Sequence, residues 1–202
     1  MKLMLTCEHA SNCLPAVFKK AVPADVLKTH RAYDIGAAQV FRKLVKFAKP
    51  EFSCEGKYSR LFVDLNRTIT NKSAFSDFLR NNESAKTQAT AYWNEYRTAI
   101  EKFVKANAKK EIVHLGIHSF TPELNGKVRN TDIGILYDPS RPKECELAQV
   151  IKAEIKRLHP EMKVRFNYPY KGTSDGLTTT LRKKFGPRYA GLEIEINQKF
   201  FR

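Results

Sequence analysis

Short apolar runs alternate with longer amphipathic segments along this chain, and that alternation constrains the fold more than any other feature. The runs lie at residues 3–7, 61–65, 112–117, 133–137, 164–166 and 192–196. Apolar residues at helical spacing mark the longer segments, at residues 29–49, 91–108, 143–158 and 178–184. Strands that alternate with helices are typical of an α/β protein with a largely parallel sheet.

The length favours a single domain. A chain of 202 residues can bury a full core and no repeat or linker divides it, so we expect residues 1–202 to form one domain. No apolar run approaches the ~20 residues that a membrane helix needs, and the apolar start is too short for a signal peptide. We therefore expect a cytoplasmic protein without a membrane segment.

The formal net charge of +15 would attract phosphates, anionic metabolites or polyanions. The basic residues are spread along the chain, however, and none of their clusters lies in an aromatic-rich nucleic-acid motif. A basic module that binds nucleic acid without catalysis is thus an alternative that the sequence does not favour. The four cysteines contain no C-x-x-C pair, which predicts free thiols rather than a zinc knuckle or disulfides.

Polar side chains with metal-binding or catalytic chemistry follow the ends of the predicted strands. Ligands of parallel α/β sheets bind at the carboxyl ends of the strands, so these positions decide the function. The residues concerned are His9 after the first strand, Asn66 and Arg67 after the second, His118 after the third, and Glu195 near the end of the last. Two imidazoles, a guanidinium and a carboxylate supply the nitrogen ligands, anion clamp and general base of a zinc hydrolase.

Each of these groups also has a structural interpretation. A lone histidine is more often hydrogen-bonded in a core than bound to a metal, although two histidines at one sheet edge favour ligands. Asn66 and Arg67 by themselves are typical of a turn with a surface cation. Glu193 and Glu195 share one face of their strand, opposite Leu192, so this face is either exposed to solvent or lines a site.

His114 and His118 are four residues apart, and on a helix they would face the same side and could bind one metal ion together. The surrounding run, residues 112–117, has the pattern of a strand, in which four residues span ~13 Å. One ion cannot reach both side chains. We predict that His118, at the end of the strand, is a ligand and that His114 is a hydrogen-bonded structural residue.

Five motifs resemble those of the N-formylglutamate amidohydrolase family. They are TCEHASN at 6–12, SRLFVDLNR at 59–67, HSFTP at 118–122, NYPYKG at 167–172 and GLEIEINQ at 191–198, so the resemblance spans almost the whole chain. The DLNR and HS motifs also resemble those of the zinc carboxypeptidases. The resemblance implies a phosphorylase/hydrolase-like fold, a three-layer αβα sandwich with a mixed but mostly parallel sheet, around one zinc ion.

The same resemblance implies a role for each catalytic candidate. Glu195 corresponds to the general base that takes a proton from water and passes it to the leaving amine. Asn66 and Arg67 correspond to the pair that grips the carboxylate of the substrate, a task that suits the planar fork of arginine. Arg60 and Arg129 are basic candidates for polarising the scissile carbonyl or holding a second carboxylate.

The metal ligands are less completely specified. His9 and His118 correspond to the two histidine ligands of the family. The carboxypeptidase pattern has a carboxylate ligand three residues after the first histidine, where this chain has Asn12, a poor ligand for zinc. Glu8 adjoins His9 but would point to the opposite face of an extended strand. We favour Asp34 as the third ligand, although a helix-start carboxylate is an equally supported interpretation of it.

The leading hypothesis is a zinc-dependent amidohydrolase that cleaves the acyl amide of a small anionic N-acyl amino acid, similar to N-formylglutamate. Tyr170 lies in a segment that resembles the carboxypeptidase pocket loop and is expected to contact the substrate, although a later tyrosine is replaced by the threonine run 178–180. Related alternatives are a deacylase for succinyl- or acetyl-amino acids, or an amidase for a γ-linked or cell-wall-derived peptide.

Overall fold

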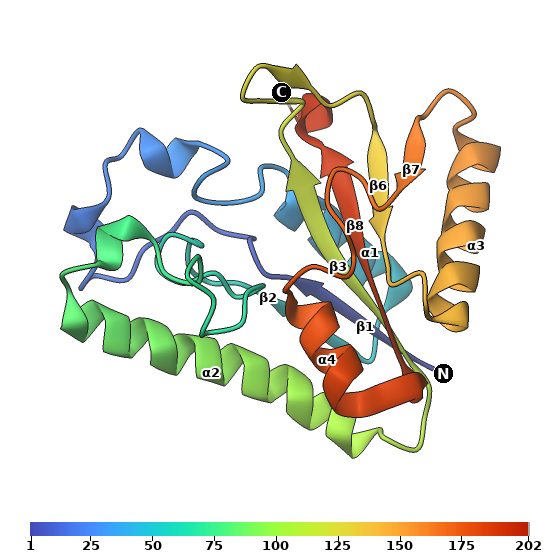
Figure 1. The fold of residues 1–202 in the computed structure, drawn as a ribbon, viewed down its shortest axis with the longest axis horizontal. Coiled ribbons are helices and arrows are strands. Elements are labelled where there is room, and N and C mark those ends of the chain that lie inside the picture. The colour runs from blue at the N-terminus through green and yellow to red at the C-terminus, as the bar shows by residue number, and fades with distance from the viewer. Residues whose placement is uncertain (202) are drawn as a thin grey trace.

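The protein is built on a six-stranded sheet in which four strands run parallel (Figure 1). The computed structural model describes residues 1–201. The strand order is β2-β1-β3-β8-β6-β7, and only β6 and β7 run opposite to the rest. The strands are β1 Lys2–Cys7, β2 Phe52–Glu55, β3 Ile112–Phe120, β6 Ile133–Leu136, β7 Val164–Phe166 and β8 Tyr189–Asn197, and β4 Glu123–Leu124 pairs with β5 Lys127–Val128 in a separate hairpin.

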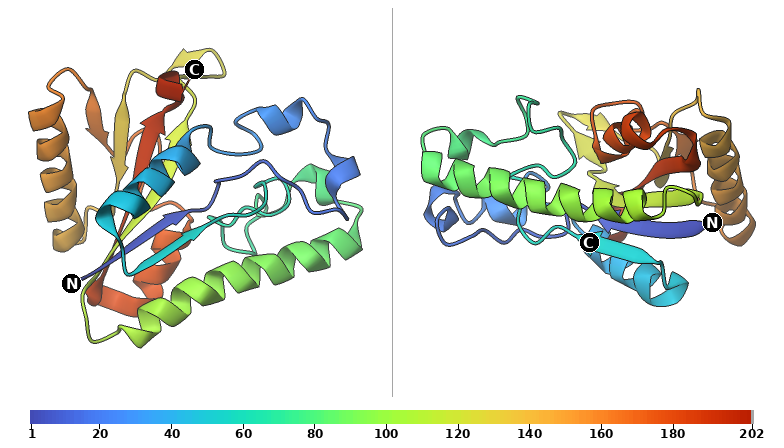
Figure 2. Two further views of the ribbon diagram at one scale, coloured as in Figure 1. Left: turned by 180° about the vertical axis from the view of Figure 1, so that it is seen from behind. Right: turned by 90° about the horizontal axis from the view of Figure 1, so that it is seen from below.

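Helices cover both faces of the sheet, which gives the predicted three-layer αβα architecture (Figure 2). One face packs against α1 (Ala37–Ala48) and α3 (Pro142–Leu158), and the other packs against α2 (Glu83–Ala106) and α4 (Leu177–Phe185). Successive side chains of a strand point to opposite faces of the sheet, so Met4 of β1 packs with α2 and α4 whereas Leu5 packs with α1. The short 3₁₀ helices are Lys19–Ala21, Val26–Lys28, Asp77–Leu79, Gly186–Arg188 and Gln198–Phe201.

The apolar run 61–65 is a buried loop, so its prediction as a strand was wrong. Its backbone forms turns, as in the hydrogen bond from Phe62 N to Ser59 O. The apolar side chains of the run pack in the same cluster as α2 instead of pairing with another strand. An apolar run shows that a segment is buried but does not show what covers it. The second strand is instead Phe52–Glu55, at the sheet edge.

Two predicted helices have different boundaries. The helix expected from residue 29 begins only at Ala37, after Gly36 with φ of +84°, where a Cβ would also collide with the ring of Phe201. The helix expected from residue 91 begins at Glu83, because the side chain of Asn82 accepts a hydrogen bond from Ala85 N and caps it. The first difference leaves residues 29–36 as turns that carry Asp34.

The parallel strands bring the predicted site residues to one edge of the sheet. β1, β3 and β8 are neighbours, and their register pairs His118 with Glu195. His9 follows the end of β1 at the same edge. No helix within residues 1–201 is long and apolar enough to span a membrane.

Candidate active site

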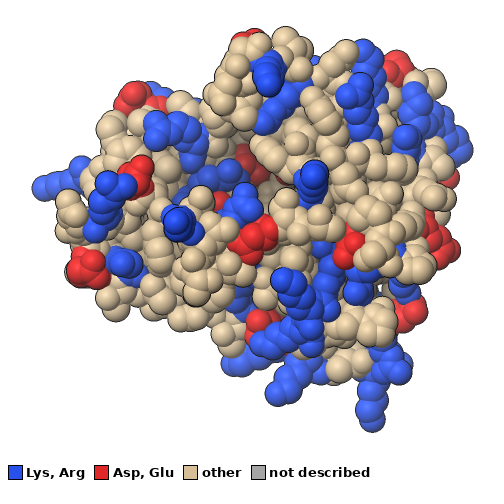
Figure 3. All heavy atoms as spheres, in the orientation of Figure 1, with Lys and Arg blue, Asp and Glu red and all other residues tan. Residues whose placement is uncertain are grey.

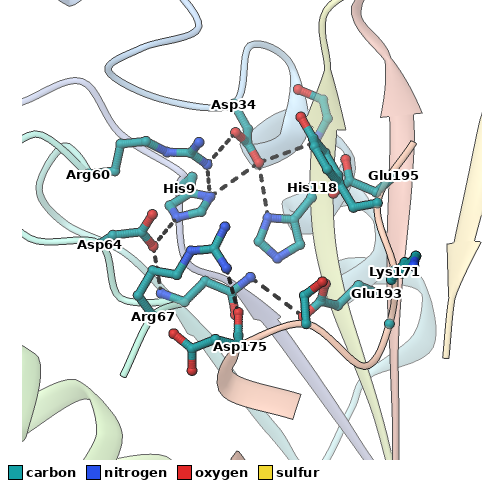
Figure 4. Close-up of a pocket in the computed structure, with 15 residues that line it drawn as sticks. His9, Asp34, Arg60, Asp64, Arg67, His118, Lys171, Asp175, Glu193 and Glu195 are labelled. Atoms are coloured by element: carbon teal, nitrogen blue, oxygen red, sulfur yellow. Dashed lines mark hydrogen bonds and ion pairs between the residues drawn. The ribbon is translucent and has the colours of Figure 1, made fainter. Parts of the chain in front are cut away.

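A cavity of about 170 Å³ opens at the carboxyl edge of β1, β3 and β8, where Figure 3 shows a hollow with acidic and basic atoms inside it. This is smaller than the roughly 300–1,000 Å³ of pockets for drug-sized ligands, so the cavity suits a molecule of amino-acid size. Figure 4 shows its lining, which is His9, Asp34, Arg60, Asp64, Asn66, Arg67, His118, Ser119, Tyr170, Lys171, Gly172, Ser174, Asp175, Glu193 and Glu195.

Three buried residues of this lining, His9, Asp34 and His118, lie close enough to hold one metal ion. Their ligand atoms are all within 4.8 Å of one another. Asp34 Oδ2 lies 3.4 Å from His9 Nδ1 and 3.0 Å from His118 Nδ1, so both imidazoles turn the same nitrogen toward the carboxylate (Figure 4). Two imidazole nitrogens and one carboxylate oxygen form a donor set that zinc accepts in hydrolases, with a fourth position left for water or substrate.

Backbone contacts hold Asp34 between the two histidines, although it lies in a turn. Its N–H donates to His9 O at 3.0 Å, which ties the turn to the end of β1. Its Oδ2 also accepts from Ser119 N at 3.3 Å, at the end of β3. Contacts from two strands therefore orient the carboxylate.

The outer nitrogens of both histidines face carboxylates. Asp64 Oδ1 lies 2.7 Å from His9 Nε2, and Glu8 Oε2 lies 3.0 Å from His118 Nε2. Tyr96 OH donates to Glu8 Oε1 at 3.1 Å, which orients that carboxylate in turn. Carboxylates on the far side of metal-binding histidines fix the ring orientation and tautomer and raise ligand basicity. The residues present therefore fit a metal ion.

The charges of this cluster also favour a cation. Burial by itself lowers the pKa of His118, but its contacts with Asp34 and Glu8 raise that pKa well above the usual value. Burial opposes ionisation of Glu8, yet the contact with His118 outweighs it and lowers the pKa of Glu8 to about 2. The two carboxylates thus favour positive charge at this position, charge that a metal ion would also supply.

Glu195 faces the cavity beside this triad. The side chain is 5% exposed, and its Oε2 is buried without a hydrogen-bond partner among residues 1–201. Burial and the nearby charges of Asp34 and Glu193 raise the pKa of Glu195 to about 8. A bound cation would favour the carboxylate form. A buried carboxyl group with one free oxygen in a cavity is suited to proton transfer.

Arg60 approaches the triad from the loop that follows β2. Its Nη2 donates to Asp34 Oδ1 at 2.7 Å and also contacts His9 Nδ1. This guanidinium places positive charge beside the carboxylate of Asp34. It is therefore one of the groups closest to the atoms that would hold the metal.

Asn66 and Arg67 lie side by side in the cavity wall but make different contacts. Asn66 Oδ1 accepts from Leu177 N at 2.8 Å and so caps the first turn of α4, whose own N-cap residue offers no side chain. Its Nδ2 lies 3.5 Å from Glu193 Oε1. Arg67 Nη1 donates to Asp175 O at 2.6 Å, and its guanidinium points into the cavity (Figure 4).

Comparisons with known proteins place this geometry in a family. The sequence profile of the N-formylglutamate amidohydrolases matches residues 1–202. The chain belongs to this family. Gene product Atu2144 of Agrobacterium tumefaciens is similar to it with a TM-score of 0.81 and 29% identity, over 99% of this chain and 82% of that one. N-formylglutamate amidohydrolase from Ralstonia eutropha JMP134 shares the fold, with a TM-score of 0.68 and 15% identity over 98% and 82% of the two chains. No curated protein sequence matches significantly.

The N-formylglutamate amidohydrolase family consists of hydrolases that act on amide bonds, so the cavity is a candidate active site. The predicted site residues that line it are His9, Asp34, Arg60, Asn66, Arg67, His118, Tyr170 and Glu195. Arg129 is outside the lining, but its Nη1 donates to the OH of Tyr170, a lining residue, at 3.2 Å. The chemical roles of these predicted site residues stay predictions.

The three candidates for the third metal ligand have different surroundings in the structure. Asn12 lies outside the cavity lining, where its Nδ2 donates to Leu27 O at 3.0 Å. Glu8 follows the last residue of β1, so strand alternation no longer directs it, and its carboxylate reaches the outer nitrogen of His118. Asp34 alone of the three joins both histidines in the cluster.

Four charged lining residues, Asp64, Lys171, Asp175 and Glu193, were not named as site candidates in the sequence analysis. Asp64 offered a signal, since it is the one charged residue in the apolar run 61–65. Glu193 was expected on the face of Glu195 but was given no role. Lys171 and Asp175 lie in the loop between β7 and α4, the segment that was expected to reach the cavity through Tyr170 but in which only Tyr170 was named as a site residue.

His114 is a buried structural residue, as predicted. Its Nε2 lies 2.7 Å from Thr6 Oγ1 and its Nδ1 lies 2.5 Å from Tyr189 OH. Burial lowers the pKa of His114 to about 4. The ring is therefore neutral at physiological pH and holds β1, β3 and β8 together by hydrogen bonds.

This shift predicts a specific pH dependence of stability. Because the pKa of His114 is lower in the folded than in the unfolded chain, the unfolded state binds more protons below about pH 6.5. The full stabilisation that the neutral ring of His114 gives to the fold is present above that pH. About 2–3 kcal/mol of the unfolding free energy is lost as the pH falls toward 4. Urea unfolding at pH 7 and pH 4.5 should show a smaller pH-dependent loss in His114→Gln than in the wild type. Equal losses would contradict this assignment.

Proposed function

We propose that this protein is a zinc-dependent amidohydrolase that cleaves the acyl amide of a small anionic N-acyl amino acid, with N-formyl-L-glutamate as the first candidate. The observation that carries the proposal is the buried triad of His9, Asp34 and His118 beside Glu195, whose Oε2 has no hydrogen-bond partner among residues 1–201. Family membership supports the reaction class. Zinc is the metal proposed because two nitrogens and one carboxylate suit its ligand preferences.

Each of these residues has a separate role in the proposed reaction. Zinc held by the triad would supply Lewis acidity toward the acyl oxygen and toward water. Glu195 takes the proton of the attacking water and passes it to the leaving amine, which its free Oε2 allows. Arg60 stabilises the negative charge that develops on the acyl oxygen. Arg67 binds the carboxylate of the substrate through its planar fork.

The cavity supports a small anionic substrate. Arg67 and Lys171 both line it and offer two cations to a dicarboxylic amino acid. The net charge of +15 would raise the local concentration of anions near the protein. The volume favours an amino acid over a γ-linked or cell-wall-derived peptide. The four free cysteines support a cytoplasmic reaction.

Related substrates and a non-catalytic role are separated by one experiment. The protein loaded with one equivalent of zinc is incubated with N-formyl-, N-acetyl- and N-succinyl-glutamate, N-formyl-leucine and a γ-glutamyl dipeptide, and the released acid or amine is measured. We expect the highest kcat/KM for an N-acyl glutamate. A higher value for the dipeptide would favour the alternative of an amidase for a γ-linked peptide. No turnover of any of them, with zinc verified at the triad, would overturn the proposed function and leave the nucleic-acid-binding alternative.

A further inference from the structure

Arg97 of α2 is a buried arginine whose guanidinium donates to backbone carbonyls. Its side chain is 4% exposed, and it forms no ion pair among residues 1–201. The guanidinium lies over the ring of Trp93, 4.9 Å from its centroid. Burying a charge without an opposite charge is costly, so such a residue is expected to have a specific task.

The guanidinium of Arg97 binds two backbone carbonyls that lie on either side of Asn66. Its Nε donates to Leu65 O at 3.0 Å and its Nη2 donates to Arg67 O at 2.9 Å. Trp93 Nε1 donates to Arg67 O as well, at 3.0 Å. Arg97 and Trp93, both in α2, therefore fix the backbone of Arg67, whose guanidinium enters the cavity.

The segment that Arg97 holds, residues 64–68, carries groups on both the substrate-binding side and the metal-binding side of the candidate site. Arg67 faces the cavity, and Thr68 donates to Asp175 Oδ2 through both its backbone N and its hydroxyl. At the other end, Asp64 contacts the outer nitrogen of His9, but its own N–H is held by Ala74 O at 2.8 Å, independently of Arg97. The two carbonyls that Arg97 binds belong to Leu65 and Arg67, whereas Asp64 has this separate anchor at its N–H.

We propose that Arg97 is a positioning residue that holds Arg67 in the geometry in which it binds the carboxylate of the substrate. The proposal rests on the proposed function for the identity of that ligand. A lysine would keep the charge, but its single ammonium group cannot span two carbonyls as the guanidinium fork does. Arg97→Lys therefore removes the geometry and leaves the charge.

The test compares the kinetics of Arg97→Lys with those of the zinc-loaded wild type on N-formyl-L-glutamate. Loss of carboxylate binding that is equal in the ground and transition states raises KM and leaves kcat almost unchanged. We expect KM to rise at least about tenfold, with kcat within about threefold and one zinc per chain retained. Trp93→Phe removes one of the two donors to Arg67 O and should raise KM less. If Arg97→Lys does not fold, Trp93→Phe provides the same comparison.

The matched control is Arg141→Lys. Arg141, the N-cap residue of α3, also donates to two backbone carbonyls, Gly186 O at 2.8 Å and Tyr189 O at 2.5 Å, and forms an ion pair with Glu144. These carbonyls lie at the start of β8, at the opposite end of the strand from Glu195. We expect this variant to lose stability and to keep the wild-type KM. A general loosening of the fold would raise KM in both variants and would overturn the proposal, as would an unchanged KM in Arg97→Lys.

A second measurement does not depend on the substrate. Hydrogen exchange of the Asn66 and Arg67 amides, which donate to Asp64, should be at least about tenfold faster in Arg97→Lys and unchanged in Arg141→Lys. Unchanged exchange in Arg97→Lys would show that Arg97 does not hold the segment. If the wild type hydrolysed no N-acyl amino acid, the proposed function would fail, and the exchange rates would still decide whether Arg97 positions Arg67.

Discussion

Glu195→Gln is expected to lose a factor of about 10²–10⁴ in kcat while it retains its metal ion, because glutamine has nearly the same shape but cannot accept the proton of the attacking water. Glu195 is the cavity-facing carboxyl group with a buried oxygen that has no hydrogen-bond partner among residues 1–201. It is paired in register with His118 but is not one of the three clustered ligands. Steady-state kinetics on N-formyl-L-glutamate, together with metal analysis, check the prediction.

The matched control is Glu193→Gln. Glu193 lies two residues away on the same face of β8 and also lines the cavity, but its Oε1 already accepts from Thr178 Oγ1 at 3.1 Å. We expect it to orient Asn66 rather than move a proton, so kcat should fall less than about tenfold. If both variants lost activity equally, the specific role of Glu195 as general base would be contradicted.

His118→Ala is expected to lose the metal ion and, with it, all measurable hydrolysis. His118 is one of two nitrogen donors in the triad, and alanine leaves a single imidazole with Asp34. Loss of an outer-shell partner lowers metal affinity roughly 10–100-fold, so loss of a ligand should lower it further. Mass-spectrometric metal analysis of the protein after dialysis measures this directly.

His159→Ala is the control for that variant. His159 is exposed, follows the end of α3 and lies 3.5 Å from Glu161. It is not part of the cavity lining. The control should retain about one metal ion per chain. If His118→Ala retained the wild-type content, the triad would not be the metal site.

The sequence predicted the central strands of the sheet because β1, β3, β6 and β8 are largely buried and therefore read as apolar runs, whereas the edge strand β2 is only partly buried and was missed. It could not predict the loop at 61–65, since burial under α2 produces the same apolar pattern as burial within a sheet. The residues at the strand exits were nonetheless found, because Asn66 and Arg67 follow an apolar segment that ends at the cavity whether it is a strand or a loop.

Tertiary contacts were needed to choose among Asn12, Glu8 and Asp34 as the third metal ligand. Asp34 reaches the histidines because its backbone N–H binds His9 O, a contact between segments that no local spacing encodes. Glu8 has its role because Tyr96, far along the chain, orients its carboxylate toward His118. Arg97 was hidden for a similar reason, since a charged residue within an amphipathic pattern reads as solvent-exposed.

The central claim is that the triad holds the metal ion on which amide hydrolysis depends. The most direct measurement is to strip the protein with a chelator, titrate zinc back and follow formate release from N-formyl-L-glutamate. The rate should be near zero in the stripped protein and should rise in proportion to zinc until one equivalent per chain is bound. A stripped protein that hydrolysed the substrate at the full rate would contradict the claim.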